Sequence, residues 1–502
     1  MDGVLPLCYN DPMRERIVPA LRCALEAASL LRKDATLLAA VSGGADSVAM
    51  LHAIAALRRE EGFHLTAVHV EHGLRGADSQ RDAEFVSILC EELDVPLRVY
   101  HAGLSGGMGG PGAENRARRA RRAFFQEAMG DLRADALLLA HHRDDQAETM
   151  LMHLLRGAGA AGLGGMRAIT PFDGGVLLRP FLSISREELL SALQRNGLSH
   201  REDSSNAQPC CLRNRLRLGA MPLLTACQPR ASQHMAQAAA QLQWDEDCLE
   251  GMAEESLRTA RISWPGAFAL RCAPLQTLPK ALLLRVLRMW VHGALLLPRG
   301  GPDADSTPDG TGNERAMVSP ELTLSLEDSL RLYHLALGQG RMNLPQGLQA
   351  IRTGSFLHLS RQNGAPLTPF RGALPLRVLP QPGEYCLGPH AFRLNPLNGQ
   401  PPAGLGRTAL PLCAALLSQG PTLRYPQPGD RFHPFGAGGN KALRRYFTDR
   451  KVDRPFRAAW PVVALGSAVL WVAGVGAGEA TRFPNSAQGL WILQSPADLP
   501  YP

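Results

Sequence analysis

Short apolar runs alternate with charged, helix-periodic segments throughout the first 225 residues. The apolar runs have the length of strands buried on both faces: Ala35–Val41, His64–Val70, Leu97–Tyr100 and Ala136–Ala140. The segments between them predict helices: Asp46–Arg58, Asp78–Leu93, Ala113–Met129 and Asp144–Leu155. This alternation predicts an α/β domain over residues 1–225, with a Rossmann-like, doubly wound parallel sheet. In such sheets the ligand lies at the carboxyl ends of the strands, so motifs at those ends carry functional weight.

The rest of the chain changes character twice. Residues 226–362 predict a helical domain, with long helices over Ala231–Arg258 and Leu278–Leu297 and a flexible loop at 300–313 that is rich in Gly, Pro, Asp, Ser and Thr. Residues 363–502 are punctuated by Pro and Gly and predict a small strand-rich domain. Its strand-like pieces are Ala391–Leu394, Pro461–Leu465 and Val469–Val472.

Composition narrows the class of protein. Hydrophobic residues make up 45% of the 502, enough for packed cores, and no run of eighteen apolar residues predicts a membrane span. Residues 1–20 contain Asp2, Asp11 and Glu15 and lack the apolar stretch of a secretory signal. The ten cysteines show no C-x-x-C spacing, which argues against a zinc ribbon or disulfide framework. We therefore expect a cytoplasmic protein that is not bound to a membrane.

The charge balance favours a nucleic-acid partner. The chain has 53 basic and 46 acidic residues, a net charge of +7, and only four of its basic residues are lysines. Arginine binds phosphate through a planar fork and stacks on bases. An arginine bias of the genome would give the same composition, so the distribution of the charges has to decide.

A small-residue turn follows the first predicted strand and opens the first long helix. Small residues let backbone amides approach an anion, and a helix start supplies a positive dipole end. The turn therefore predicts a phosphate site, with Asp46 binding Mg²⁺ through the phosphate. Its members are Ser42, Gly43, Gly44, Ala45, Asp46 and Ser47. The alternative is an ordinary βα turn with a polar cap.

The fourth predicted strand runs into a cluster of histidines and carboxylates, His141–Thr149. Asp145 and Glu148 are three residues apart and share a helix face, where they could bind Mg²⁺ or hold a substrate ammonium group. The alternative is an acidic cap on a helix. His141 and His142 have no third zinc ligand at a familiar spacing, so we expect them to contact nucleotide or backbone.

Arginines gather in three further segments. Arg118 lies in an arginine-dense predicted helix where it could bind triphosphate or RNA, and Arg213 and Arg217 are one helical turn apart. Near the C-terminus, basic residues are interleaved with aromatics, which is typical of an RNA-binding surface that holds phosphates and stacks on bases. The candidate RNA-binding residues there are Arg431, Lys441, Arg444, Arg445 and Lys451. A solvated basic face is the alternative at each segment.

Together these segments resemble the tRNA(Ile)-lysidine synthetases, bacterial members of the PP-loop ATP pyrophosphatase group. The matching motifs occur in family order: S-G-G-A-D-S (42–47), V-E-H-G-L-R-G (70–76), E-N-R-A-R-R-A-R-R-A-F-F (114–125), H-H-R-D-D-Q-A-E-T (141–149), R-G-A-G-A-A-G-L-G-G-M (156–166), E-D-S-S-N (202–206), R-N-R-L-R (213–217) and G-D-R-F-H-P-F-G (429–436). The chain departs from the family at Glu71, where Asn is usual, and at Arg122, where Tyr is usual. The segments 106–112 and 300–313 look like insertions.

The resemblance implies a ligase that adenylates the wobble cytidine of a CAU-anticodon isoleucine tRNA with ATP and then attaches L-lysine to form lysidine, changing codon reading from AUG to AUA. It implies that the 42–47 turn, His72 and His142 bind ATP, and that Asp145 and Glu148 bind lysine. Asp46, Arg118, Asp145, Glu148, Arg213 and Arg217 are the implied catalytic residues. ATP and Mg²⁺ are required, the second and third domains bind the tRNA, and a homodimer is possible.

Three rival functions fit less well. A tRNA thiolation enzyme is expected to carry catalytic C-x-x-C or paired distant cysteines, and none here has that spacing. An amidotransferase-coupled synthetase would bring a glutaminase domain, yet nothing in residues 1–30 resembles an N-terminal nucleophile. A non-enzymatic RNA-binding protein would explain the basic C-terminal segment but not the phosphate turn with its aspartate.

Overall fold

The computed structural model describes residues 13–71, 77–101, 113–201, 211–264, 267–296, 324–362, 375–378, 381–388, 390–396, 407–482 and 491–494. The chain forms two compact units that meet within one long helix, the first reaching Cys248 and the second starting at Leu249. The two segments interpreted as insertions, 106–112 and 300–313, lie outside the described residues. The division into three domains stays a prediction.

The first unit is built on a six-stranded sheet. Its strands are β1 (Thr36–Ala40), β2 (His64–Glu71), β3 (Leu97–His101), β4 (Ala136–Leu138), β5 (Ile169–Phe172) and β6 (Gly175–Leu178). They lie in the order β3-β2-β1-β4-β6-β5, and every pair is parallel except β5 with β6. The chain moves outward from β1 to β3 and then returns to the other side of β1. The predicted parallel sheet is confirmed, and its topological switch point lies between β1 and β4.

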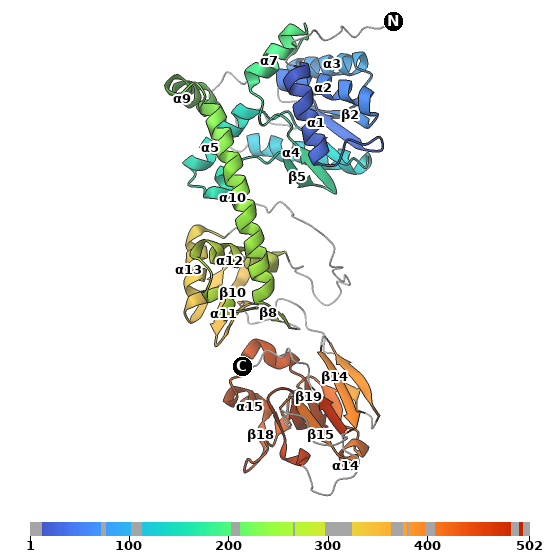
Figure 1. Cartoon of the computed structure of the whole chain (residues 1–502), viewed down its shortest axis with the longest axis vertical. Coiled ribbons are helices and arrows are strands. Elements are labelled where there is room, and N and C mark those ends of the chain that lie inside the picture. The colour runs from blue at the N-terminus through green and yellow to red at the C-terminus, as the bar shows by residue number, and fades with distance from the viewer. Residues whose placement is uncertain are drawn as a thin grey trace. The chain divides into compact units, whose positions relative to one another are not determined.

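Helices cover both faces of this sheet (Figure 1). Alternate residues of β1 point to opposite faces, so Leu37 and Ala39 join the core beneath α1, α2, α3 and α7, whereas Leu38 packs beneath α4 with Phe125. The helices of this unit are α1 (Val18–Ala27), α2 (Ala45–Glu61), α3 (Ala77–Glu92), α4 (Ala113–Asp131), α5 (Arg143–Leu155), α6 (Ala160–Leu163), α7 (Arg186–Arg195), α8 (Leu212–Arg215), the π-helical turn η3 (Leu216–Ala220) and α9 (Met221–Cys227).

The second unit begins within α10 (Ala231–Ala260) and carries the predicted helices of the middle segment. Helices α11 (Cys272–Gln276), α12 (Lys280–Leu295) and α13 (Leu326–Leu337) pack on a five-stranded antiparallel sheet that the sequence pattern did not predict. Its strands are β7 (Arg261–Trp264), β8 (Ala267–Arg271), β9 (Gly340–Leu344), β10 (Leu348–Thr353) and β11 (Phe356–Arg361). The buried faces of these short strands are recognisable only once the helices that cover them are known.

The C-terminal part is strand-rich, as predicted. One sheet has the order β12-β16-β19-β20-β17-β18, with β21 on β20, and the other has the order β13-β14-β22-β15. The strands are β12 (Leu376–Arg377), β13 (Gly383–Leu387), β14 (His390–Pro396), β15 (Ala409–Leu412), β16 (Thr422–Arg424), β17 (Arg431–Phe432), β18 (Lys441–Ala442), β19 (Val462–Leu465), β20 (Ala468–Val472), β21 (Gly476–Ala477) and β22 (Trp491–Gln494). Helices α14 (Ala414–Ser418) and α15 (Leu443–Asp449) accompany them. In the described part of the chain, no helix has the length and apolarity that a membrane span requires.

Candidate active site

The predicted phosphate turn connects β1 to α2. Gly43 adopts φ +87°, a conformation that favours glycine. The Ser47 hydroxyl closes the turn, because its Oγ accepts a hydrogen bond from the Ser42 amide at 3.1 Å and donates one to the Gly44 carbonyl at 2.9 Å. The backbone amide of Arg201 also donates to the Gly43 carbonyl at 2.9 Å. The turn is therefore held from within and from a distant segment, at the N-terminus of a seventeen-residue helix.

The carboxylate–histidine cluster lies at the end of β4 and the start of α5. His142 is the N-cap of α5: its Nδ1 accepts from the Asp145 amide at 3.4 Å, and Asp145 Oδ2 accepts from the His142 amide at 3.2 Å. His142 and Asp145 therefore form a capping box, which agrees with the alternative of an acidic residue that stabilises the helix start. The same Asp145 oxygen lies 3.4 Å from His142 Nε2.

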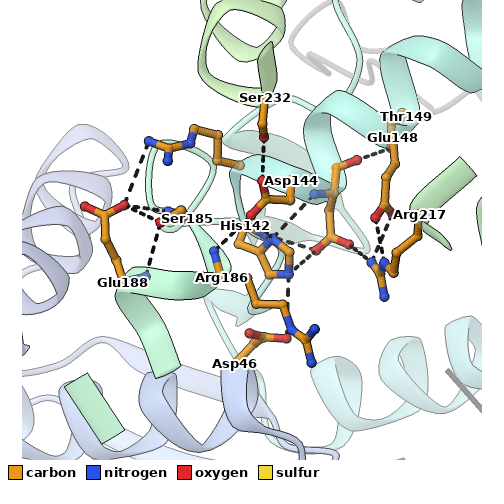
Figure 2. A network of polar contacts seen from close by, with 12 residues as sticks. Asp46, His142, Asp144, Glu148, Thr149, Ser185, Arg186, Glu188, Arg217 and Ser232 are labelled. Carbon is orange, nitrogen blue, oxygen red and sulfur yellow. Dashed lines mark hydrogen bonds and ion pairs between the residues drawn. The ribbon is translucent and has the colours of Figure 1, made fainter. Parts of the chain in front are cut away.

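The two motifs meet at the switch point of the sheet (Figure 2). Because β1 and β4 are parallel neighbours, both end at the same edge, and Asp46 of α2 faces His142. Asp46 Oδ2 lies 3.7 Å from His142 Nε2. The sequence placed Asp46 and His142 at strand ends, and the strand order brings those ends together.

The two aspartates differ in charge environment. Burial raises the pKa of Asp46, although His142 opposes this shift. Its Oδ1 is buried and accepts no hydrogen bond. Burial also favours a higher pKa for Asp145, but the positive charges of His142, His141 and Arg213 outweigh it, so the pKa of Asp145 is lowered. A buried carboxylate oxygen without a donor beside a phosphate turn suits a cation, so Asp46 fits the Mg²⁺ that the sequence predicted there.

Arg213 and Arg217 converge on one buried carboxylate. The Glu148 side chain is only 3% exposed. Its Oε2 accepts from Arg213 Nε at 3.1 Å and from Arg217 Nη2 at 3.0 Å, and its Oε1 accepts from Arg217 Nε at 2.6 Å. Arg217 Nη2 also donates to Asp145 Oδ1 at 3.0 Å, and Arg213 Nη2 donates to Thr149 Oγ1 at 2.9 Å. Both arginines are thus fixed beside the cluster of Asp46, His142 and Asp145.

The C-terminal basic residues lie on β17, β18, α15 and the turn that follows α15. Arg431, Arg444, Arg445 and Lys451 are exposed, and Lys441 is half-buried and pairs with Asp449 at 2.9 Å. The expected interleaving of arginines with stacking aromatics is wrong for most of the segment. Three of its aromatics, Phe432, Tyr446 and Phe447, are at most 2% exposed and belong to the core, because the short strand and helix turn their apolar faces inward.

A buried ion pair supports this surface. Arg424 donates from both terminal nitrogens to the two oxygens of Asp430, at 2.8 and 2.9 Å, and both side chains are at most 5% exposed. Asp430 Oδ2 also accepts from the Gln427 amide at 2.8 Å. Asp430, part of the motif at 429–436, therefore fixes the loop before β17, a structural function.

Comparisons with known proteins match both the sheet-based first unit and the strand-rich C-terminal part. The PP-loop domain family matches residues 18–224, and the TilS substrate C-terminal domain family matches residues 422–493. The tRNA(Ile)-lysidine synthase of Geobacillus kaustophilus is 32% identical over 494 residues, which cover 95% of this chain and 98% of that protein. The chain belongs to the tRNA(Ile)-lysidine synthase family.

A second member of the family gives the same assignment. The tRNA(Ile)-lysidine synthase of Geobacter sulfurreducens is 31% identical and covers 93% of this chain and 94% of its own. A crystal structure of the TilS C-terminal domain is 27% identical, with a TM-score of 0.20, and covers 21% of this chain and 82% of its own. The tRNA(Ile)-lysidine synthase resemblance given above on the motifs is confirmed.

Several predicted residues lie at the margin of the described structure of this tRNA(Ile)-lysidine synthase family member. His72 lies outside the described residues, and Arg118 belongs to α4, although its side chain is not among those described. Glu71, the departure at the end of β2, places its Oε2 2.5 Å from Nδ1 of His101 at the end of β3. Arg122, the other departure, lies over the ring of Phe172 at 5.4 Å.

Sequence reasoning missed the residues that join the site to its surroundings. Asp144 accepts from the Ser232 hydroxyl of α10 at 2.5 Å and from the Arg186 amide at 2.9 Å. Gln146 Oε1 accepts from the Met166 amide at 2.7 Å, and its Nε2 donates to the Gly164 carbonyl at 3.2 Å. Both residues lie in the 141–149 motif. Their role in holding distant segments against the site follows only from their partners in the structure. No group of three or more His, Cys, Asp or Glu side chains within the described ranges is arranged to hold a metal.

Proposed function

We propose that this protein is an ATP-dependent ligase that attaches L-lysine to the wobble cytidine of CAU-anticodon tRNA(Ile), so that the anticodon reads AUA in place of AUG. Family membership supports the overall reaction. The observation that carries the site assignment is the meeting of the phosphate turn with the His142–Asp145 cluster at the switch point, with Asp46 and His142 at 3.7 Å. Nucleotides bind at this position in open α/β sheets.

In the first step the base oxygen of the cytidine attacks the α-phosphate of ATP, and pyrophosphate leaves. The turn from Ser42 to Ser47 would hold the phosphates through its amides and the N-terminus of α2. Bound Mg²⁺ would supply positive charge for the pyrophosphate, and Asp46, with its unpaired buried oxygen, would hold it. Arg213 and Arg217, fixed by Glu148, would offset the negative charge that develops at the phosphate.

In the second step the lysine ε-amine attacks the activated base carbon and AMP leaves. Asp145 suits the ammonium form of lysine, because its lowered pKa keeps it charged. Glu148 was predicted beside it as a second lysine-binding residue. Glu148 accepts three hydrogen bonds from arginines and is 3% exposed, whereas Asp145 accepts one from an arginine and is 13% exposed, so we propose instead that Glu148 positions Arg213 and Arg217. The amine must lose a proton before it attacks, and the two carboxylates nearest to His142, Asp145 at 3.4 Å and Asp144 at 3.6 Å, are the candidate acceptors.

The second and third predicted domains, 226–362 and 363–502, would bind the tRNA. Exposed arginines at positions 431, 444 and 445 support a phosphate-binding surface there. His72 and Arg118 remain proposed for ATP binding and catalysis. A homodimer and a cytoplasmic location also remain predictions.

The experiment that tests the function is incorporation of radiolabelled lysine into a purified CAU-anticodon tRNA(Ile) transcript, with ATP and Mg²⁺. Asp46→Ala and a tRNA(Met) transcript serve as controls. We expect labelling of the isoleucine tRNA alone, lost in the variant. ATP cleavage to AMP that depends on tRNA but gives no labelling would keep the PP-loop chemistry and exclude lysine as the nucleophile.

A further inference from the structure

Phe435 is an exposed phenylalanine in a basic part of the molecule. Its ring lies in the turn between β17 and β18 and is 57% exposed. The other aromatics of the same two motifs, Phe432, Tyr446 and Phe447, are buried in the core. Of these four aromatic side chains, Phe435 is therefore the one whose ring a partner can reach.

The turn that presents Phe435 is held by several hydrogen bonds. The Phe435 amide donates to the Ala477 carbonyl at 3.1 Å, and the Gly436 amide donates to Glu479 Oε2 at 2.8 Å. The His433 ring, through Nε2, contacts the Ala437 carbonyl at 2.7 Å. Because the backbone is fixed before any partner arrives, binding at this ring costs little conformational entropy.

A cation already lies against the ring. The guanidinium carbon of Arg482 is 5.6 Å from the centroid of Phe435, within the range of a cation–π contact. Arg482 is itself held by Glu479 Oε1 at 3.4 Å. The ring is thus supported by an arginine and still more than half exposed, which leaves aromatic surface for a second planar group.

The charges around the turn favour a nucleic acid over a protein. Arg431 begins β17, Lys441 begins β18, and Arg444 and Arg445 follow in α15. The nearby acids are already engaged: Asp449 pairs with Lys441, and Glu479 accepts from the Gly436 amide and Arg482. A planar apolar surface surrounded by exposed arginines matches a nucleotide, with its flat base and its phosphate.

We propose that Phe435 stacks on an unpaired base of the tRNA, with Arg482 supporting the ring. The base has to be unpaired, because the faces of bases inside a helical stem are covered by their neighbours. This inference rests on the proposed function for the identity of the RNA. It adds one residue that contacts the face of a base to a surface whose other proposed contacts are with phosphates.

The first test measures the tRNA(Ile) dissociation constant for Phe435→Ala, Phe435→Trp and a control, Ile88→Ala, which truncates an equally exposed (57%) side chain of α3 in the first unit. Loss of one stacked base predicts about 5- to 150-fold weaker binding for Phe435→Ala. Phe435→Trp and the control should bind as the wild type does. The salt dependence of binding should not change in Phe435→Ala, because no phosphate contact is lost, and kcat at saturating tRNA should be unchanged.

The second test identifies the base with tRNAs that each lack one unpaired base. For the wild-type protein, one abasic position should weaken binding by the same factor as Phe435→Ala, and that position should have no further effect in the variant. Wild-type affinity of Phe435→Ala, or an equal response of both proteins to every abasic tRNA, would overturn the proposal. If the wild type failed to incorporate lysine but showed this base-specific loss, the proposed function would fail and the stacking site would stand.

Discussion

Replacing Glu148 with glutamine separates the two roles that a carboxylate at this position can have. Glu148 accepts three hydrogen bonds from Arg213 and Arg217 and is 3% exposed. Glutamine keeps the shape of the side chain but loses the charge and replaces one accepting oxygen with an NH₂ group, which cannot accept from the arginines. If Glu148 positions the arginines, Glu148→Gln lowers kcat. If Glu148 binds lysine directly, the variant raises the KM for lysine.

The structure sets the expected magnitudes. Removing one partner of a buried ion pair costs about 3–5 kcal/mol of stability. The Arg213 and Arg217 side chains are 32% and 26% exposed, so water can solvate them in part, and we expect a loss nearer 2–3 kcal/mol. Displacing positive groups from a developing phosphate charge costs about 100-fold in kcat. The KM for lysine should change less than about threefold, because Asp145 remains as the proposed lysine-binding carboxylate.

Steady-state lysine incorporation at saturating tRNA and ATP gives kcat and the lysine KM, and thermal melting gives the stability. Glu188→Gln is the matched control. Glu188 accepts from the Ser185 amide and hydroxyl at 2.7 and 2.8 Å in the capping box of α7 and pairs with Arg16 at 3.1 Å and Arg143 at 3.8 Å, so its partners lie outside the cluster of Asp46, His142 and Asp145. This control should lose about 1 kcal/mol of stability and keep its kcat. A near-normal kcat for Glu148→Gln with a lysine KM raised tenfold or more would refute the positioning role.

Four further predictions follow from single contacts. Asp46→Asn should abolish lysine incorporation yet raise the free energy of unfolding near neutral pH, because burial raises the pKa of Asp46 and its charged form disfavours folding. In melts at decreasing pH this gain should vanish below the ordinary pKa of the carboxyl, and a gain that stays constant would contradict this cause. Gly43→Ala should cost about 1–2 kcal/mol in urea unfolding, because φ is +87° while the added Cβ has room, with its nearest neighbours at 3.5–3.6 Å; unchanged stability would count against a strained turn. Asp430→Ala should destabilise the C-terminal part by about 3–5 kcal/mol in chemical denaturation and weaken tRNA binding in a filter assay, because it leaves Arg424 buried without its partner. A variant as stable as the wild type would show that the buried pair is dispensable. Arg444→Ala and Arg445→Ala should each reduce the slope of log affinity against log salt by about 1, and an unchanged slope would remove that residue from the phosphate contacts.

The sequence predicted the local structure of the first unit well. The apolar runs gave the four parallel strands β1 to β4, and the charged segments between them gave helices α2 to α5, with boundaries a few residues apart. These elements are long or strongly patterned, so their periodicity dominates other local signals. The antiparallel sheet β7–β11 was not predicted, because its short strands show their buried face only beside α12 and α13.

The candidate site was predicted in part. Asp46, His142 and Asp145 follow strands in the sequence, and parallel strands end at one edge, so their approach could be expected. Glu148 was read with Asp145 as a pair of ligands, since residues three apart share a helix face. In the structure Glu148 accepts from arginines that lie 65 and 69 positions away, which its spacing from Asp145 did not indicate.

The sequence by itself determined the chemistry available and the order of the elements that carry it, because side-chain periodicity and turn residues act over a few positions. Tertiary structure alone decided which groups meet. It paired Glu148 with Arg213 and Arg217, left one oxygen of Asp46 without a donor, and buried Phe432 while exposing Phe435 three residues later. Such outcomes depend on packing between segments far apart in the chain. Packing decides which charges and rings are buried, and the free-energy cost of desolvating them cannot be inferred from a local sequence pattern.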